Sequence, residues 1–253
     1  MHSVFATSLN VELDGFLFHV GDVRSPLSCC GAVVVPGELG HLLAWSRPGD
    51  RAIVKRGVLR VYDLEGVWEL DLSAFEVRSL SVASPVAIER LATLEKAVAS
   101  MGVEDRIGLV RDMRFDEAVR VLEKRDPSVD ELRTAIGFLL GRGLGLTPSG
   151  DDLLVGYGIA RWLLGKAETF ARTVLGELGR QTTDVSASYL RAMAAGYANE
   201  GYCALAQAAA AGEIDRFSEL LGDLQRVGHT SGNDGLFGFW TGLRSVMRNR
   251  SGI

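Results

Sequence analysis

The stretch GRGLGLTPSGDDLLVG, residues 141–156, decides how the second half of this 253-residue chain folds. Part of it returns as HTSGNDGLFG at residues 229–238. When SGDDLLVGY and SGNDGLFGF are aligned, serine, glycine, aspartate, leucine and glycine recur at matching places, and an aromatic residue follows. We call residues 149–152 and 231–234 the first and the second SGxD phrase. The repeat predicts two helices that begin in the same way, 82 residues apart.

Both phrases match the capping-box pattern at a helix N-terminus. In that pattern the hydroxyls of Ser149 and Ser231 accept from backbone N–H groups in the first turn of their helices. Asp152 and Asp234, three places on, accept in return from the backbone N–H of these serines. Carboxylates also suit the positive end of a helix dipole. Apolar residues at helical spacing follow each phrase. One interpretation is therefore purely structural, with the phrases serving as helix caps.

Three features go beyond what capping requires. Asp151 adds a second carboxylate beside Asp152, although one acid completes the box. Gly156 and Gly238 occupy the same step of the two helices and predict a close helix crossing, with both helix starts facing one cavity. Glycine is also concentrated around the first helix start, at Gly141, Gly143, Gly145 and Gly150.

Such a cavity favours an anionic ligand, because helix N-termini and glycine-rich loops present free N–H groups. Two carboxylates beside an anion would repel it, which leaves two arrangements open. In one, Asp151 and Asp152 hold a divalent cation, most plausibly Mg²⁺, against a phosphate or carboxylate ligand. In the other, the acids turn inward as caps and the glycine loop alone contacts the anion.

Two further groups of residues are candidates for the site. His229 precedes the second phrase and is a possible general acid or hydrogen-bond donor, or else a helix-end residue without chemistry. Hydroxyl residues around position 183 either cap a helix or line a pocket. The predicted catalytic set is Asp151, Asp152, His229 and Asp234. The predicted ligand-binding set is Gly143, Gly145, Thr147, Ser149, Gly150, Thr183, Ser186, Thr230, Ser231 and Gly232.

The rest of the chain predicts an α+β fold. Short Val-, Leu- and Phe-rich runs bounded by Gly, Pro or Asp indicate strands in the first eighty residues, in an antiparallel sheet or small barrel. Residues 30–37 and 41–47 are two of these runs, and residues 51–63 form a hairpin. We divide the chain into a β-rich region, 1–82, and a helical region, 83–253. Helices are predicted at residues 84–102, with Ser84 as cap and Pro85 in the first turn, and at 115–124, 129–140, 151–164, 167–180, 185–198, 214–227 and 233–247.

Composition indicates a folded, soluble, cytoplasmic protein. Hydrophobic residues make up 47% of the chain and charged residues 23%, and the net charge is −5. No basic stripe is present to bind nucleic acid, and we expect neither a signal peptide nor a membrane span. Cys29, Cys30 and Cys203 lack the spacing of a zinc site and are expected to be reduced thiols.

Three separated phrases resemble the signatures of a known family. GLTPSGDDLLVG, TTDVSASYLRAMAAG and GHTSGNDGLFGFWTGL, between residues 141 and 245, are similar in sequence and order to those of the AllH-like family. This family, once described as a domain of unknown function, is named for a subunit of oxamate carbamoyltransferase. Here Leu144 replaces the proline of the family's G-P-G-L-T-P-S-G-D-D, and Asn233 precedes Asp234 where relatives often have tryptophan. The carboxylates and His229 are intact.

The resemblance implies a role in anaerobic purine or allantoin breakdown. The enzyme would exchange a carbamoyl group between oxalurate and phosphate, giving oxamate and carbamoyl phosphate. The family subunit is expected to act with two other proteins, one of which resembles the acyl-CoA synthetase class. The alternative is a non-catalytic subunit that binds ligand or assembles the complex, while its partners carry the chemistry.

Overall fold

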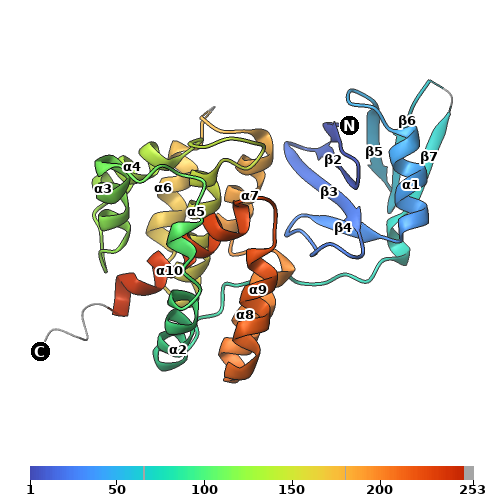
Figure 1. Ribbon diagram of the computed structural model, residues 1–253. Coiled ribbons are helices and arrows are strands. Elements are labelled where there is room, and N and C mark those ends of the chain that lie inside the picture. Colours follow the sequence, from blue (N-terminus) through green and yellow to red (C-terminus); the bar gives the residue numbers. More distant parts are fainter. Residues whose placement is uncertain (65, 180, 248–253) are drawn as a thin grey trace, which may run out of the picture. The chain divides into compact units, whose positions relative to one another are not determined.

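The computed structural model describes residues 1–64, 66–179 and 181–247 (Figure 1). Its internal contacts divide the chain into two compact units, Met1–Leu80 and Ser81–Ile253. The predicted α+β class is confirmed, because the strands lie within residues 3–71 and helices dominate the chain that follows. The division predicted after residue 82 stays a prediction.

The first unit contains two sheets. The first has the order β1-β2-β3-β4 and the second the order β5-β6-β7. Their strands are β1 (Ser3–Val4), β2 (Ser8–Leu13), β3 (Phe16–Asp22), β4 (Gly31–Val34), β5 (Arg51–Lys55), β6 (Val58–Tyr62) and β7 (Val67–Asp71). All pairs are antiparallel except β3 and β4, which run parallel. The expectation of an antiparallel sheet is therefore right for the second sheet, whereas the first is mixed.

Two tight turns set the registers of these sheets. Asp14 and Gly15 join β2 to β3 with φ angles of 51° and 80°, and Arg56 and Gly57 join β5 to β6 with φ angles of 54° and 77°. Positive φ at both central residues is the geometry of a type I′ turn, which matches the twist of paired strands. The hairpin predicted at residues 51–63 is confirmed.

One predicted strand of this unit is wrong. Residues 41–47 belong mostly to a helix, α1 (Pro36–Trp45). Pro36 stands in its first turn, where the fixed φ of proline favours a helix, and Leu39 and Leu42 lie one turn apart on its buried face. These two leucines join side chains of both sheets in one core, formed by Leu9, Val11, Val20, Val34, Leu39, Leu42, Leu59, Val61 and Leu70.

The second unit is helical. Its α-helices are α2 (Ile88–Ala99), α3 (Met113–Leu122), α4 (Val129–Leu139), α5 (Ser149–Leu163), α6 (Glu168–Glu177), α7 (Asp184–Ala194), α8 (Glu200–Ala211), α9 (Phe217–Gln225) and α10 (Ser231–Met247). Helix α2 begins at Ile88, so the predicted start at Ser84 and Pro85 is wrong. Helix α8 was not predicted, although Asn199 caps its start and Gly212, with φ of 80°, ends it. Its alanine-rich sequence has too little polar contrast to show a helical period.

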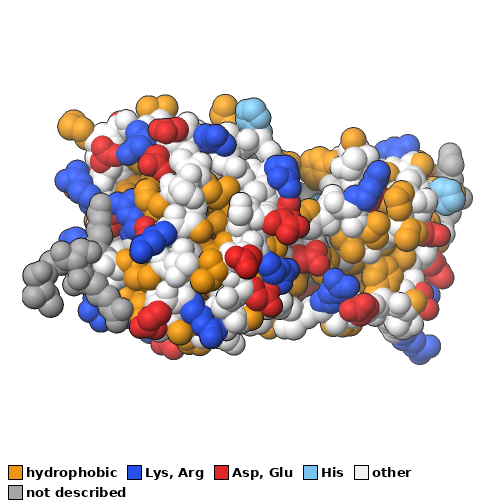
Figure 2. All heavy atoms as spheres, turned by 60° about the horizontal axis from the view of Figure 1, so that its bottom comes forward, with side chains coloured by type: hydrophobic (Ala, Val, Ile, Leu, Met, Phe, Trp, Pro, Cys, Tyr) orange, Lys and Arg blue, Asp and Glu red, His pale blue; other side chains and the backbone are white. Residues whose placement is uncertain are grey.

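Among the residues that the structure describes, no helix is both long and apolar enough to span a membrane. Figure 2 shows a face on which acidic and basic side chains are interspersed. This face has no continuous basic surface of the kind that tracks a phosphate backbone.

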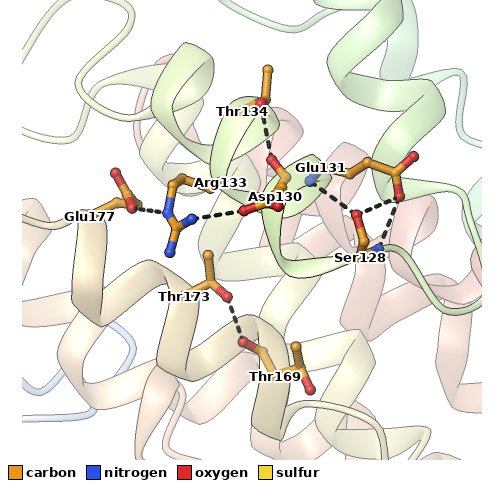
Figure 3. Close-up of polar contacts among 8 residues, drawn as sticks. All are labelled: Ser128, Asp130, Glu131, Arg133, Thr134, Thr169, Thr173 and Glu177. Atoms are coloured by element: carbon orange, nitrogen blue, oxygen red, sulfur yellow. Dashed lines mark hydrogen bonds and ion pairs between the residues drawn. The ribbon is translucent and has the colours of Figure 1, made fainter.

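The second unit does contain a full capping box, at the start of α4 (Figure 3). The backbone N–H of Glu131 donates to Ser128 Oγ at 3.3 Å, and the N–H of Ser128 donates to Glu131 Oε2 at 2.9 Å. Arg133 of the same helix then reaches Glu177 of α6 at 2.9 Å, which ties the two helices together. The SGxD phrases differ from this arrangement.

Candidate functional site

The two SGxD phrases begin helices that cross at unusually short range. A Cβ atom built on Gly156 would lie 1.9 Å from the carbonyl oxygen of Gly235, and one built on Gly238 would lie 1.9 Å from that of Leu153. The two contacts are equivalent, because each residue matches its counterpart in the 82-residue repeat. The predicted close crossing of α5 and α10 is therefore confirmed, and Figure 1 shows the two helices together.

The glycine inside each phrase has a packing role. A Cβ on Gly150 would lie 2.0 Å from the carbonyl oxygen of Leu139, and one on Gly232 would lie 2.2 Å from that of Leu224. Leu139 ends α4 and Leu224 lies near the end of α9, so each phrase is pressed against the C-terminus of the preceding helix. Only a residue without a Cβ fits there.

The serines do not cap their own helices. Ser149 is the first residue of α5, its N-cap is Pro148, and no side chain caps this helix. Ser231 is likewise the first residue of α10, and Thr230 supplies the carbonyl that accepts from the N–H of Asp234 at 2.9 Å. The predicted capping boxes are therefore wrong. Each serine lies one position too far into its helix for that geometry.

Instead, each serine acts on the aspartate of the other phrase. The hydroxyls of Ser231 and Thr147 favour the charged form of Asp152, and those of Thr230 and Ser149 favour that of Asp234. Ser231 and Thr147 also contact each other, with 3.1 Å between their Oγ atoms. The serine of each phrase thus contacts the aspartate of the other phrase, and the crossing of α5 and α10 brings Asp152 and Asp234 together.

Burial dominates the electrostatics of this pair. It raises the pKa of Asp152 to about 8, and the negative charge of Asp234 contributes in the same direction. The pKa of Asp234 is also raised by burial, against the opposing effect of the Gly108 N–H, which donates to Asp234 Oδ1 at 2.7 Å. Within the described chain, the buried Oδ2 atoms of both aspartates have no hydrogen-bond partner. The pair is built to hold a proton at neutral pH and has free capacity for hydrogen bonding.

Asp151 serves the neighbouring loop. Its Oδ1 accepts from the N–H of Gly141 at 2.7 Å, and its Oδ2 accepts from the hydroxyl of Thr182. Burial raises its pKa, although these bonds and the hydroxyl of Ser186 oppose the shift. Because both oxygens are bonded, Asp151 does not share the surroundings of Asp152, which lies on another side of α5.

The glycine-rich loop between α4 and α5 is exposed from residue 142 to residue 146. Gly143 and Gly145 have φ angles of 120° and 93°, which only glycine adopts without strain. Gly143 closely approaches the N–H of Ser149, whereas a Cβ on Gly145 would meet nothing. Thr183 joins the loop to α7, because its hydroxyl donates to the carbonyl of Leu146 and accepts from the N–H of Ser186 at 3.1 Å.

His229 is placed apart from the buried pair. It is exposed and lies in the turn that leads from α9 into α10. The other predicted site residues separate into three groups. Asp152, Asp234, Thr147, Ser149, Thr230 and Ser231 come together, Gly150 and Gly232 pack behind them, and Asp151, Thr183 and Ser186 support the loop that contains Gly143 and Gly145.

Sequence reasoning missed two residues of the site. Gly108, in a segment without a recognisable motif, supplies the N–H that binds Asp234. Tyr202 of the unpredicted helix α8 is buried, its hydroxyl lies 2.7 Å from a Cβ built on Gly235, and the charge of Asp152 helps to raise its pKa. No signal in the sequence around Gly108 could have identified it. A prediction of α8 would have drawn attention to Tyr202.

The side chains do not fit the predicted Mg²⁺ pair. Asp151 and Asp152 were expected to share the ion, but both oxygens of Asp151 already accept hydrogen bonds. Across the described residues, no group of three His, Cys, Asp or Glu side chains is arranged to hold a metal. The two oxygens without a partner among the described residues belong to Asp152 and Asp234, not to the predicted pair of Asp151 and Asp152.

Comparison with known proteins agrees with the phrases that build this site. Residues 139–243 match the family model for oxamate carbamoyltransferase subunit AllH. The matched segment begins at the end of α4 and extends into α10, so it contains both SGxD phrases. No solved structure matches the chain significantly. Residues 139–243 are therefore similar to the AllH family, which is named for a subunit of an oxamate carbamoyltransferase.

Proposed function

We propose that this chain is the subunit of an oxamate carbamoyltransferase that binds the carbamoyl group, and that Asp152 and Asp234 act on it. One observation carries the proposal. Two carboxyl groups from equivalent helix starts, those of Asp152 and Asp234, lie together, and each has a buried oxygen without a partner among the described residues. Natural proteins leave such atoms unpaired mainly where a ligand or a proton has a use for them.

In the proposed reaction a phosphate oxygen attacks the carbamoyl carbon of oxalurate. A C–O bond forms and the C–N bond to the oxamate nitrogen breaks. That nitrogen takes the bonding electron pair together with a proton, and the products are carbamoyl phosphate and oxamate. The step therefore needs an acid that is still protonated at neutral pH.

Asp152 meets this need in the proposal. With a pKa of about 8 its carboxyl group is mostly neutral at pH 7, so it does not repel an anionic substrate and can donate its proton to the leaving nitrogen. Asp234 keeps a free Oδ2 to accept a hydrogen bond from the carbamoyl NH₂ group. The pair would orient the group and supply the proton without a metal ion in the step.

The anionic ends of the substrates would bind at the loop and the helix starts. Gly143 and Gly145 let the backbone approach a ligand closely, and the first turns of α5 and α10 present N–H groups toward an anion. His229 is exposed at the start of the second phrase and would contact the phosphate rather than the buried carbamoyl group.

A second candidate is a binding or assembly subunit whose partners carry the chemistry. The observation in its favour is the loop itself, since Leu144 is 94% exposed and Leu146 is 49% exposed. Two exposed leucines beside a candidate site suit contact with another subunit. Under this alternative the acids affect complex formation and leave turnover per assembled complex unchanged.

The test measures phosphate-dependent conversion of oxalurate by the assembled complex, with Asp152→Asn and Asp234→Asn. Loss of a general acid costs about 10²-fold or more in rate, so Asp152→Asn should lose turnover by at least that factor. Asp234→Asn should also lose turnover, because the carboxylate that accepts from the carbamoyl NH₂ group is gone. Asp223→Asn, on the exposed side of α9, is the matched control and should retain full activity.

Assembly and binding are measured on the same samples. Sedimentation reports the fraction assembled, and calorimetric titration with carbamoyl phosphate, phosphate, oxamate and oxalurate, with and without Mg²⁺, reports binding. Full turnover in folded Asp152→Asn and Asp234→Asn would overturn the catalytic proposal. Reduced assembly with normal turnover per complex would support the second candidate.

A further inference from the structure

Helix α8 brings one tyrosine to the start of α10. Tyr202 is 7% exposed, and its backbone N–H donates at 3.0 Å to Oδ1 of Asn199, the N-cap of α8. Its ring packs on α10, where the centroid of the Phe239 ring lies 5.6 Å away. The cap and the ring contact together fix the position of the Tyr202 hydroxyl.

Gly235 leaves open the space that this hydroxyl occupies. A Cβ atom built on Gly235 would lie only 2.7 Å from Tyr202 Oη. In the 82-residue repeat Gly235 matches Leu153, so α10 lacks a side chain where α5 carries a large one. Gly235 also follows Asp234 directly in the sequence. The departure from the repeat therefore admits one polar atom beside the second SGxD phrase.

The Tyr202 hydroxyl lies on the side of Asp152. The same Cβ position on Gly235 is 3.7 Å from the backbone oxygen of Asp152. Burial, and after it the negative charge of Asp152, raises the pKa of Tyr202, so the phenol stays protonated throughout the physiological range. Within the described residues no hydrogen bond joins this hydroxyl to the carboxyl group, whose Oδ2 is unpaired. Each of the two side chains therefore has a hydrogen bond to offer to a third group.

Packing alone does not explain the oxygen of Tyr202. Its hydroxyl makes no hydrogen bond within the part of the chain that the structure describes. It differs from the hydroxyl of Tyr157 in α5, which is completely enclosed as well as unpaired. A phenylalanine would make the same ring contact with Phe239, and a largely buried hydroxyl without a partner costs free energy. A bound ligand would give the oxygen a use.

The carbamoyl oxygen is the atom that gains negative charge in the proposed reaction. When phosphate attacks the carbamoyl carbon, the electrons of the C=O bond move onto this oxygen, and they return as the C–N bond breaks. A donor aimed at such an oxygen stabilises the transition state more than the substrate. In the proposal Asp152 protonates the leaving nitrogen and Asp234 accepts from the NH₂ group, so the oxygen needs another donor. A neutral tyrosine hydroxyl has one hydrogen bond to donate.

We propose that the hydroxyl of Tyr202 donates a hydrogen bond to the carbamoyl oxygen. This inference rests on the proposed function, because it takes the carbamoyl group to lie between Asp152 and Asp234. The substrate class follows from these groups together. A ureido compound offers an oxygen that accepts from Tyr202 and an NH₂ group that donates to Asp234, whereas an acetyl group offers only the oxygen.

The test compares Tyr202→Phe with the wild type in the assembled complex. The substitution removes one unpaired oxygen, so the variant should fold and assemble as the wild type does. Its kcat for the phosphate-dependent conversion of oxalurate should fall about 10²-fold, because the hydrogen bond is strongest in the transition state, while the KM for oxalurate stays within about threefold. Tyr157→Phe, the same change at an enclosed hydroxyl, is the matched control and should keep the wild-type kcat.

A substrate analogue tests the predicted class of ligand. N-acetyloxamate carries a methyl group where oxalurate carries the NH₂ group, so it should bind the wild-type complex at least about tenfold more weakly in calorimetric titration. Equal affinity for the two compounds would overturn the assignment of a ureido ligand.

The variants separate failure of this inference from failure of the proposed function. Wild-type kcat in Tyr202→Phe, in a complex that Asp152→Asn inactivates, would overturn this inference and leave the proposed function standing. Full turnover in Asp152→Asn would overturn the proposed function, and this inference with it. A Tyr202→Phe variant that is less stable in urea and loses kcat and oxalurate affinity together would show a packing role, and so would also overturn the inference.

Discussion

At the scale of single residues, the neighbouring aspartates Asp151 and Asp152 have different roles because their side chains contact different groups. Asp151 has both oxygens bonded, to Gly141 and Thr182, and so fixes the loop that precedes α5. Asp152, the next residue, has a buried oxygen without a partner among the described residues and a pKa of about 8. The sequence presents them as an equivalent pair, but successive helix residues point about 100° apart and contact different neighbours.

The raised pKa of Asp152 predicts a specific dependence of stability on pH. The folded chain holds this proton more tightly than the unfolded chain. The contribution of Asp152 to the free energy of unfolding is therefore complete below pH 3.8 and is lost as pH rises through about 8. Asp152→Asn mimics the neutral acid and removes this dependence. Urea unfolding should show the variant more stable than the wild type by about 1 kcal/mol or more at about pH 9.

The control for this prediction is a carboxyl group whose pKa is shifted in the opposite direction. The pKa of Asp71 is lowered by hydrogen bonds from Ser73, so its contribution is already complete above pH 3.8. Asp71→Asn should therefore leave the difference in stability between about pH 5 and about pH 9 as in the wild type. A wild-type protein that loses no stability relative to Asp152→Asn in this interval would contradict the raised pKa.

Asp151 should respond differently to substitution. Asp151→Ala leaves the half-buried donors of Gly141 and Thr182 without an acceptor, which should cost about 1–3 kcal/mol in the free energy of unfolding. Denaturant titration checks this value, and proteolysis at residues 142–146 should become faster because the loop loses its anchor. If stability and cleavage rate stay at wild-type levels, Asp151 does not hold the loop.

At the scale of elements, the repeated phrase was a reliable guide to position and a poor guide to local geometry. It correctly predicted two helices that cross at Gly156 and Gly238, since glycine at matching steps has few other uses. It wrongly predicted that Ser149 and Ser231 are N-caps. The same S-x-x-D spacing fits a helix that starts one residue earlier, and only tertiary contacts select that start.

The remaining site residues depend on contacts between distant segments. Gly108 reaches Asp234 across 126 residues of sequence, and no local pattern encodes such a meeting. Tyr202 belongs to α8, whose small apolar residues hide the helical period. In the first unit, the short apolar run that begins at Leu42 fits a strand or a helix, and Pro36, in the first turn of α1, is the residue that favours the helix.

The crossing of α5 and α10 predicts opposite effects for two similar substitutions. Gly156→Ala places a methyl group 1.9 Å from a backbone oxygen, so the helices must separate, at a cost of about 1–3 kcal/mol. Gly137→Ala, in α4, meets open space and should stabilise the protein by about 0.5–1 kcal/mol through helix propensity. Chemical denaturation of both variants measures the difference, and equal effects would contradict the close crossing.

At the scale of the whole molecule, each unit has its own interior. The core of the first unit is formed by side chains from residues 9–70, and the second unit buries a separate set along α2 to α10. Separate cores are the physical condition for independent folding. The resemblance to the AllH family lies entirely in the second unit.

We therefore predict that residues 81–253 fold when expressed alone. The fragment should show helical circular dichroism, a single cooperative unfolding transition, and the same pH dependence from Asp152 as the full chain. Residues 1–80 serve as the complementary sample. A fragment 81–253 that lacks a cooperative transition would show that the first unit is needed for its stability.

The exchange of serines between the two phrases has a kinetic consequence. Each aspartate accepts a hydrogen bond from a serine of the other phrase, 82 residues away in the repeat. The two carboxyl groups therefore lie together, with these bonds made, only while α5 and α10 are packed against each other. Any opening that separates these helices dismantles the pair completely, and any ligand that bridges the two acids opposes that opening. Amide hydrogens at the starts of both helices should then exchange with solvent at one common rate, slowed together when such a ligand is bound.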